Sequence, residues 1–119
     1  MGPTRQVKRR RRGPVDPQLN TQARRKVLAH IRATEPNCHL CGYPINLGLD
    51  RQRHPLASCG DEVIPRKHGG SATDPANVRH SHRICNGVRA THPPTPEIKR
   101  RCRDAVERIY AGQSTQNAW

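Results

Sequence analysis

Apolar positions at helical spacing mark two stretches of the chain, one toward each end. In residues 19–34 they recur three and four residues apart, which predicts one face of an α-helix. These positions are Leu19, Ala23, Val27, Leu28 and Ile31. The opposite face is basic and carries Arg24, Arg25, Lys26 and Arg32. Asn20 or Thr21 can cap the start of this helix, and Pro36 ends it because the residue before a proline avoids helical backbone.

The second stretch predicts a helix from Pro96 to about Tyr110. Thr95, Pro96 and Glu97 supply a capping residue, a proline at the first helical position and an acid in the first turn. The apolar side of this helix consists of Ile98, Cys102, Ala105, Val106 and Ile109. We expect Gly112 to stop the helix, which leaves residues 113–119 as a polar tail.

Between these two helices the pattern predicts shorter elements. Residues 57–64 are predicted to form a strand, and residues 77–80 a second strand that pairs with the first. A turn over 65–70 and a polar loop over 71–76 join them, and residues 83–91 follow as a short helix. The order of elements indicates an α+β fold.

Composition adds a reason to look for a metal. The 119 residues correspond to one domain, but only 32% of them are hydrophobic and 3% are aromatic. This is little material for an apolar core, and small domains of this kind are commonly stabilised by a bound ion.

The charge balance favours a polyanionic partner. The chain has 22 Lys and Arg against 9 Asp and Glu, a formal net charge of +13, which favours nucleic acid through phosphate neutralisation and counterion release. Residues 1–17 contain the run from Lys8 to Arg12 and almost no apolar side chains, so we expect a disordered basic arm. This arm is either a tether to the DNA backbone or a solvated tail.

No apolar run approaches the roughly 20 residues of a membrane helix, and no apolar segment follows the basic N-terminus as it would in a secretory signal. We therefore expect no membrane partner and a cytoplasmic location. Five cysteines, two of them in a C-x-x-C pair, favour metal binding in a reducing compartment over a disulfide framework.

Two ligand pairs predict a zinc site. Cys38 and Cys41 form the first pair and His82 and Cys85 the second, each with two residues between its members. Zinc in structural sites takes four tetrahedral nitrogen or sulfur ligands, so this quartet would fill its coordination and leave no open position. Gly42 relieves the backbone of the tight turn that carries the first pair.

His80 and Cys59 are alternatives for a ligand position, and Cys102 is left over. His80 is a rival to His82, but it lies five residues from Cys85 and would need a different turn. Cys59 has no partner two residues away and is interpreted as a small strand residue. Cys102 lies on the apolar side of the last helix, where packing is the simpler role.

About half of the chain, residues 38 to 92, carries motifs that resemble an HNH endonuclease. In order, the motifs are Asp61-Glu62-Val63-Ile64-Pro65, Gly69-Gly70, Asn77-Val78 and His82-Arg83-Ile84-Cys85-Asn86. The chain resembles most closely the small zinc-containing members from bacteriophages and actinobacteria. The resemblance implies a ββα-metal fold, here a nuclease domain over residues 18–112 with flanking N- and C-terminal helices.

The resemblance also implies roles for individual residues. Asp61 and Asn86 would bind a catalytic divalent ion, Mg²⁺ or Mn²⁺. Asn77 would order the loop that positions the base, and Arg89 would contact a phosphate.

Glu62 departs from the family pattern, because most members have a histidine at this place as the general base. A glutamate can also take a proton from water. Glu62 could instead be a second carboxylate ligand, or mark an inactive nuclease retained for binding. His68, in the following turn, is a possible replacement base.

The function implied is that of a metal-dependent DNA endonuclease that hydrolyses phosphodiester bonds, with nicking as one form of it. A non-catalytic zinc module that binds DNA or RNA is the alternative. A third hypothesis, compatible with the first, is an accessory factor in phage DNA packaging that contacts terminase or portal proteins.

Overall fold

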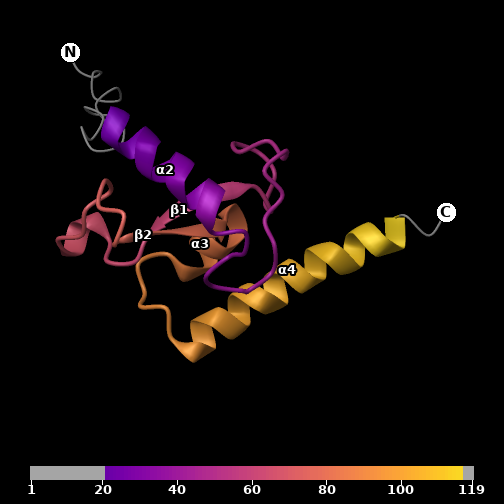
Figure 1. Cartoon of the computed structure of the whole chain (residues 1–119). Coiled ribbons are helices and arrows are strands. Elements are labelled where there is room, and N and C mark those ends of the chain that lie inside the picture. The colour runs from indigo at the N-terminus through magenta and orange to yellow at the C-terminus, as the bar shows by residue number, and fades with distance from the viewer. Residues whose placement is uncertain (1–20, 117–119) are drawn as a thin grey trace, which may run out of the picture.

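The computed structural model describes residues 21–116, and the side chains of residues 21–113. The described part is a small α+β fold with three α-helices and a two-stranded antiparallel sheet (Figure 1). Its elements are α2 (Gln22–Thr34), β1 (Ser58–Glu62), the 3₁₀ turn η2 (Arg66–His68), β2 (Val78–His82), α3 (Arg83–Arg89) and α4 (Pro96–Gln116). The basic arm expected over residues 1–17 lies outside the described residues.

The pairing of the two predicted strands is confirmed. They run antiparallel, with Cys59 opposite Ser81 and Asp61 opposite Arg79. β1 ends before the predicted position 64, because the chain turns at Pro65 into η2. β2 extends to His82, which is at once its last residue and the N-cap of α3.

Helix α2 begins at the predicted cap and lies over the sheet. The Thr21 side chain accepts a hydrogen bond from the Arg24 N–H at 3.1 Å. Val27 and Ile31 are buried against Val78. The approach is close at Gly60, where a Cβ atom would lie 2.5 Å from Leu28 Cδ2, so this position in β1 admits only glycine without a shift.

The predicted faces of α2 are wrong at two positions. Ala23 is exposed, whereas Arg24, assigned to the solvent face, is 8% exposed. Arg24 Nη1 donates to the Ala72 carbonyl at 2.8 Å and contacts Glu62. A long side chain can therefore lie along the edge of the apolar face and place its charged group on tertiary partners.

Helix α4 begins as predicted but does not stop at Gly112. The Thr95 hydroxyl accepts from the Ile98 N–H at 3.2 Å, and four of the five predicted apolar positions are buried: Ile98, Cys102, Ala105 and Val106. The helix continues through Gly112 to Gln116. Among the described glycines, positive φ occurs at Gly42 and Gly69 and not at Gly112, so the left-handed turn that would end the helix is absent there.

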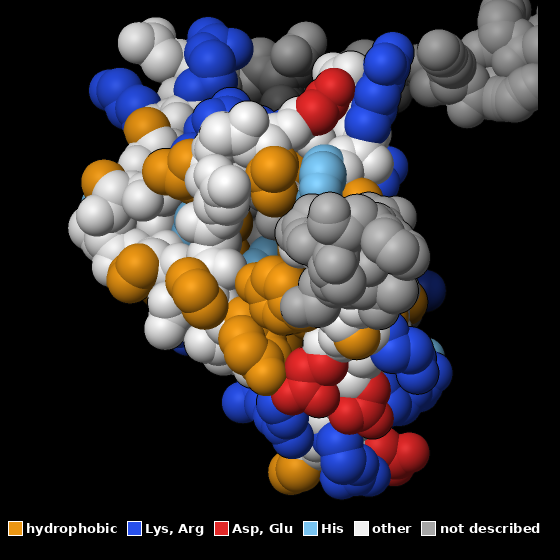
Figure 2. Space-filling view, turned by 90° about the vertical axis from the view of Figure 1, so that its right-hand side faces the viewer, with side chains coloured by type: hydrophobic (Ala, Val, Ile, Leu, Met, Phe, Trp, Pro, Cys, Tyr) orange, Lys and Arg blue, Asp and Glu red, His pale blue; other side chains and the backbone are white. Residues whose placement is uncertain are grey.

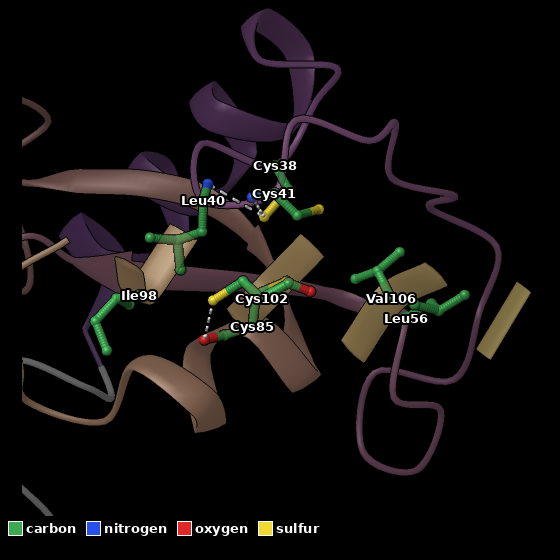
Figure 3. Close-up of a cluster of buried hydrophobic side chains, with 8 residues drawn as sticks. All are labelled: Cys38, Leu40, Cys41, Leu56, Cys85, Ile98, Cys102 and Val106. Carbon is green, nitrogen blue, oxygen red and sulfur yellow. Dashed lines mark hydrogen bonds between the residues drawn. The ribbon is translucent and has the colours of Figure 1, made fainter. Parts of the chain in front are cut away.

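The core is divided into two clusters of buried side chains. One cluster joins the predicted metal ligands to α4 (Figure 3) and consists of Cys38, Leu40, Cys41, Leu56, Cys85, Ile98, Cys102 and Val106. Cys102 is buried there and its thiol donates to the Cys85 carbonyl at 3.5 Å, as its predicted packing role requires. The smaller cluster under α2 is the one around Val78. No described helix has the length and apolar character needed to cross a bilayer.

Candidate metal centre and adjoining cleft

The four predicted zinc ligands converge on one buried point. The ligand atoms of Cys38, Cys41, His82 and Cys85 all lie within 4.8 Å of one another. His82 Nδ1 lies 3.3 Å from Cys41 Sγ and 3.9 Å from Cys85 Sγ. Nitrogen and sulfur donors bound tetrahedrally to zinc at 2.0 to 2.3 Å are about 3.5 to 3.8 Å apart. The two distances from His82 lie near this range, so the group could hold such an ion.

The surroundings of the cluster orient the ligand atoms. His82 Nε2 donates to the Pro44 carbonyl at 3.0 Å, which leaves Nδ1 as the nitrogen available to an ion. Backbone N–H groups of Leu40, Cys41 and His82 point at Cys38 Sγ from 3.4 to 3.5 Å. Hydrogen bonds from Cys41 and Cys85 lower the pKa of the Cys38 thiol, which favours the thiolate that binds metal.

His80, the rival to His82, has a different role. Its ring is buried between the Glu35 carbonyl, 2.6 Å from Nδ1, and the Ser58 hydroxyl, 2.8 Å from Nε2. Nδ1 therefore joins the C-terminal end of α2 to the sheet, and Nε2 joins β2 to β1. The Cys₃His group is complete without His80.

A cleft of about 380 Å³ opens beside this centre, between the segment that leads from β1 into η2 and the C-terminal part of α3. Three predicted catalytic residues line it, namely Asp61, Glu62 and Asn86. Its other walls are Pro65, Arg66, Lys67, Ala90 and Thr91. The fold thus brings together acids from β1 and an amide from α3 at a solvent-accessible site.

Asp61 is the most buried of these groups, at 3% exposure. Arg89 Nη1 lies 2.7 Å from Asp61 Oδ1 and 2.8 Å from Oδ2. His39 Nε2 lies 2.6 Å from Oδ2. The carboxylate is therefore held by one residue of α3 and by one residue of the turn that carries the first two cysteines.

Glu62 and Asn86 have fewer constraints. Glu62 Oε2 lies 3.1 Å from Arg24 Nη1, so α2 reaches the edge of the cleft. The Asn86 amide donates from Nδ2 to Cys59 Sγ at 3.3 Å, and its oxygen is a separate acceptor. Cys59 lies in β1, as predicted, and outside the metal cluster.

Asn77 holds the loop between the strands. Its side chain accepts from the Ile64 N–H at 2.8 Å and donates to the carbonyls of Ile64 and Ser71 at 3.0 and 2.9 Å. Gly70 lies against the same segment, where a Cβ atom would be 1.6 Å from the Ile64 carbonyl oxygen. These contacts set the course of the chain into η2, which carries Arg66 and Lys67.

Arg89 does not lie where the expected phosphate contact requires. Its side chain is 1% exposed, and besides Asp61 it donates to the carbonyls of Glu62, Val63 and His92. The basic residues on the cleft wall are Arg66 and Lys67. His68, proposed as a replacement base, is exposed in η2 and is not part of the cleft lining.

Sequence reasoning missed His39 and Arg24 as well as this basic wall. His39 lies inside the C-H-L-C turn, where only the cysteines carry a spacing signal, and Arg24 belongs to a basic run with no signal of its own. Both reach acidic residues more than twenty positions away, and such contacts have no local pattern.

Comparisons with family models, with curated proteins and with solved structures find no match to this chain. The fold and the Cys₃His group define a small α+β domain with a group able to bind a metal ion such as zinc.

Proposed function

We propose that the protein is a metal-dependent DNA endonuclease of the HNH type. The observation that carries the proposal is the cleft that gathers Asp61, Glu62 and Asn86, with Arg66 and Lys67 on its wall. Asp61 and Glu62 end β1, and Asn86 follows 24 positions after Glu62, in α3. Two carboxylates and an amide are the kind of donor set that phosphodiester hydrolysis needs.

Asp61 and Asn86 would hold the catalytic Mg²⁺ or Mn²⁺, since hard ions prefer carboxylate and amide oxygens. Asp61 Oδ2 has contacts with both His39 and Arg89, whereas Oδ1 has a contact with Arg89 alone, so Oδ1 is the oxygen that would bind the ion. When bound, the ion supplies Lewis-acid stabilisation of the phosphate and the leaving oxygen.

The chain's own residues supply the remaining chemistry. Glu62 would accept a proton from the attacking water. At the same time the water oxygen would form a bond to phosphorus, and the ester P–O bond would break. Arg66 and Lys67 would hold the phosphate, the role that the resemblance gave to Arg89. The hydrogen bonds from Asn77 would keep the segment that carries Arg66 and Lys67 at the edge of the cleft.

The surface charge favours a DNA substrate. Lys and Arg side chains gather at the upper and lower ends of the face in Figure 2, with hydrophobic side chains between them. Helix α4 alone exposes Lys99, Arg100, Arg101, Arg103 and Arg108. Contact with terminase or portal proteins stays a prediction from the resemblance.

A second function, zinc-stabilised DNA binding without cleavage, is favoured by one observation. Both proposed catalytic acids are already engaged, Asp61 by Arg89 and His39 and Glu62 by Arg24. If these pairs persist in the DNA complex, the cleft would bind phosphate but activate no water.

Nicking of supercoiled plasmid by the zinc-loaded chain separates the two functions. We expect cleavage with Mg²⁺ or Mn²⁺ that EDTA abolishes, and loss of cleavage in Asp61→Ala with zinc retained. Asp104→Ala, which removes an exposed acid of α4, is the matched control. Plasmid left intact by the wild-type chain with both ions would exclude the nuclease and leave DNA binding.

A further inference from the structure

We propose that His39 is a positioning residue for Asp61 and connects the zinc-binding turn to the catalytic cleft. The proposal rests on the proposed nuclease function. Its central observation is the contact of 2.6 Å between His39 Nε2 and Asp61 Oδ2, made by side chains that are 7% and 3% exposed. The two residues are 22 positions apart.

The zinc-binding turn determines where the His39 ring points. His39 directly follows the predicted zinc ligand Cys38. The sulfur of Cys38 accepts the backbone N–H groups of Leu40 and Cys41, the two residues after His39. The His39 N–H donates to the His80 carbonyl at 2.9 Å, which ties the turn to β2. The backbone at His39 is thus attached both to the metal cluster and to the sheet beside Asp61.

His39 supplies what Arg89 cannot. Arg89 Nη1 is almost equally distant from the two carboxylate oxygens of Asp61, at 2.7 and 2.8 Å. This symmetric contact holds the carboxylate but does not distinguish its oxygens. The His39 ring contacts Oδ2 alone, so it fixes the orientation of the carboxylate and leaves Oδ1 with one hydrogen-bond contact, against two on Oδ2.

His39 is separate from the zinc ligands themselves. The Cys₃His group already has four ligands, the number that structural zinc takes, and the His39 Nε2 is committed to Asp61. A bond in which Nε2–H donates to a carboxylate resembles the outer contacts that orient metal ligands, whose loss typically costs about 10- to 100-fold in metal affinity or activity.

The test compares His39→Leu with His39→Gln, whose amide can still donate a hydrogen bond toward Asp61. His30→Leu, at an exposed position of α2, is the control. The measurements on the full chain are zinc content, plasmid nicking as a function of Mg²⁺ concentration, and Mn²⁺ affinity from the loss of the free-ion signal in electron paramagnetic resonance.

For His39→Leu we expect one zinc per chain, nicking slower by about 10- to 100-fold, and Mn²⁺ affinity weaker by a similar factor. His39→Gln should recover most of both losses, and His30→Leu should match the wild type. Recovery by glutamine distinguishes orientation of Asp61 from a general loss of packing.

Two results would overturn the proposal. One is a His39→Leu variant with wild-type nicking and Mn²⁺ affinity, and the other is loss of zinc from that variant. A wild-type chain that binds Mn²⁺ without cutting DNA would contradict the nuclease alone, and the Mn²⁺ affinities would still decide the role of His39. A wild-type chain that binds no Mn²⁺ would overturn both.

Discussion

The Cys₃His cluster and the cleft lie side by side, yet they are built in opposite ways. The cluster consists of four buried ligands within the main apolar core, with backbone N–H groups on its sulfur atoms. The cleft is open and lined mainly by charged and polar groups. A closed set of four ligands suits an ion that stabilises the fold, whereas an open site leaves room for water and a phosphate.

The difference teaches how a chain with few apolar residues can hold buried charge. The cluster anchors the turn with His39 and the helix with Arg89, and both residues contact Asp61. We therefore expect substitutions in the cluster to destabilise the whole fold. Substitutions in the cleft wall should change only what the cleft binds.

The largest effect is expected from removing a zinc ligand. Cys85→Ser should lose the metal and unfold, since structural zinc contributes about 10 to 16 kcal/mol in small zinc domains, as much as the whole stability of a typical protein. Metal analysis and circular dichroism would measure this. Cys59→Ser, outside the cluster, should keep both zinc and fold, and a folded, metal-free Cys85→Ser chain would contradict the assignment.

Removing the buried ion pair should come next. Arg89→Ala leaves the Asp61 carboxylate buried without its guanidinium partner, which typically costs about 3 to 5 kcal/mol. Urea unfolding would measure the free energy of unfolding. Arg83→Ala, at an exposed position of the same helix, should cost little. Equal stability of the two variants would show that Arg89 is not structural.

The cleft wall should give a smaller effect, confined to DNA. Replacing Arg66 and Lys67 by glutamine should weaken DNA binding and lower the salt dependence of the binding constant by about two phosphate contacts. Binding measured over a range of salt concentrations tests this. The exposed Arg53→Gln is the single-charge control. An unchanged salt dependence in the double variant would show that Arg66 and Lys67 do not contact the DNA phosphates.

The smallest effects concern two glycines. Gly112→Ala should raise the free energy of unfolding by up to about 1 kcal/mol, because it places alanine inside a helix with no neighbour in the way. Gly42→Ala should lower stability, since φ is +86° in the zinc-binding turn. Thermal unfolding of both variants checks the opposite signs. A destabilised Gly112→Ala variant would instead support the predicted end of the helix at Gly112.

Much of the fold followed from local patterns. Residues close in the sequence decide the helix caps at Thr21 and Thr95, because a side-chain oxygen at a helix start accepts a hydrogen bond from one of its free N–H groups. The buried side of α4 likewise follows from the spacing of its apolar residues. The strand pairing was predicted as well. Gly112 was misjudged because a glycine alone does not end a helix when its backbone keeps a negative φ.

The candidate site was predictable only in part. Asp61, Glu62 and Asn86 were named from the resemblance and do line one cleft. The position of Arg89 could not be foreseen, because an arginine in a short helix can face solvent or a buried acid, and only the packing of α3 against β1 decides between them.

By itself the sequence determined the four candidate metal ligands, since two pairs at fixed spacing are a local property of the chain. It also determined the element types and a charge of +13. The tertiary structure alone decided the partners of the charged groups: Arg24 with Glu62, and His39 and Arg89 with Asp61. Those pairs join distant segments, and a buried charge is stable only where the fold places its partner beside it.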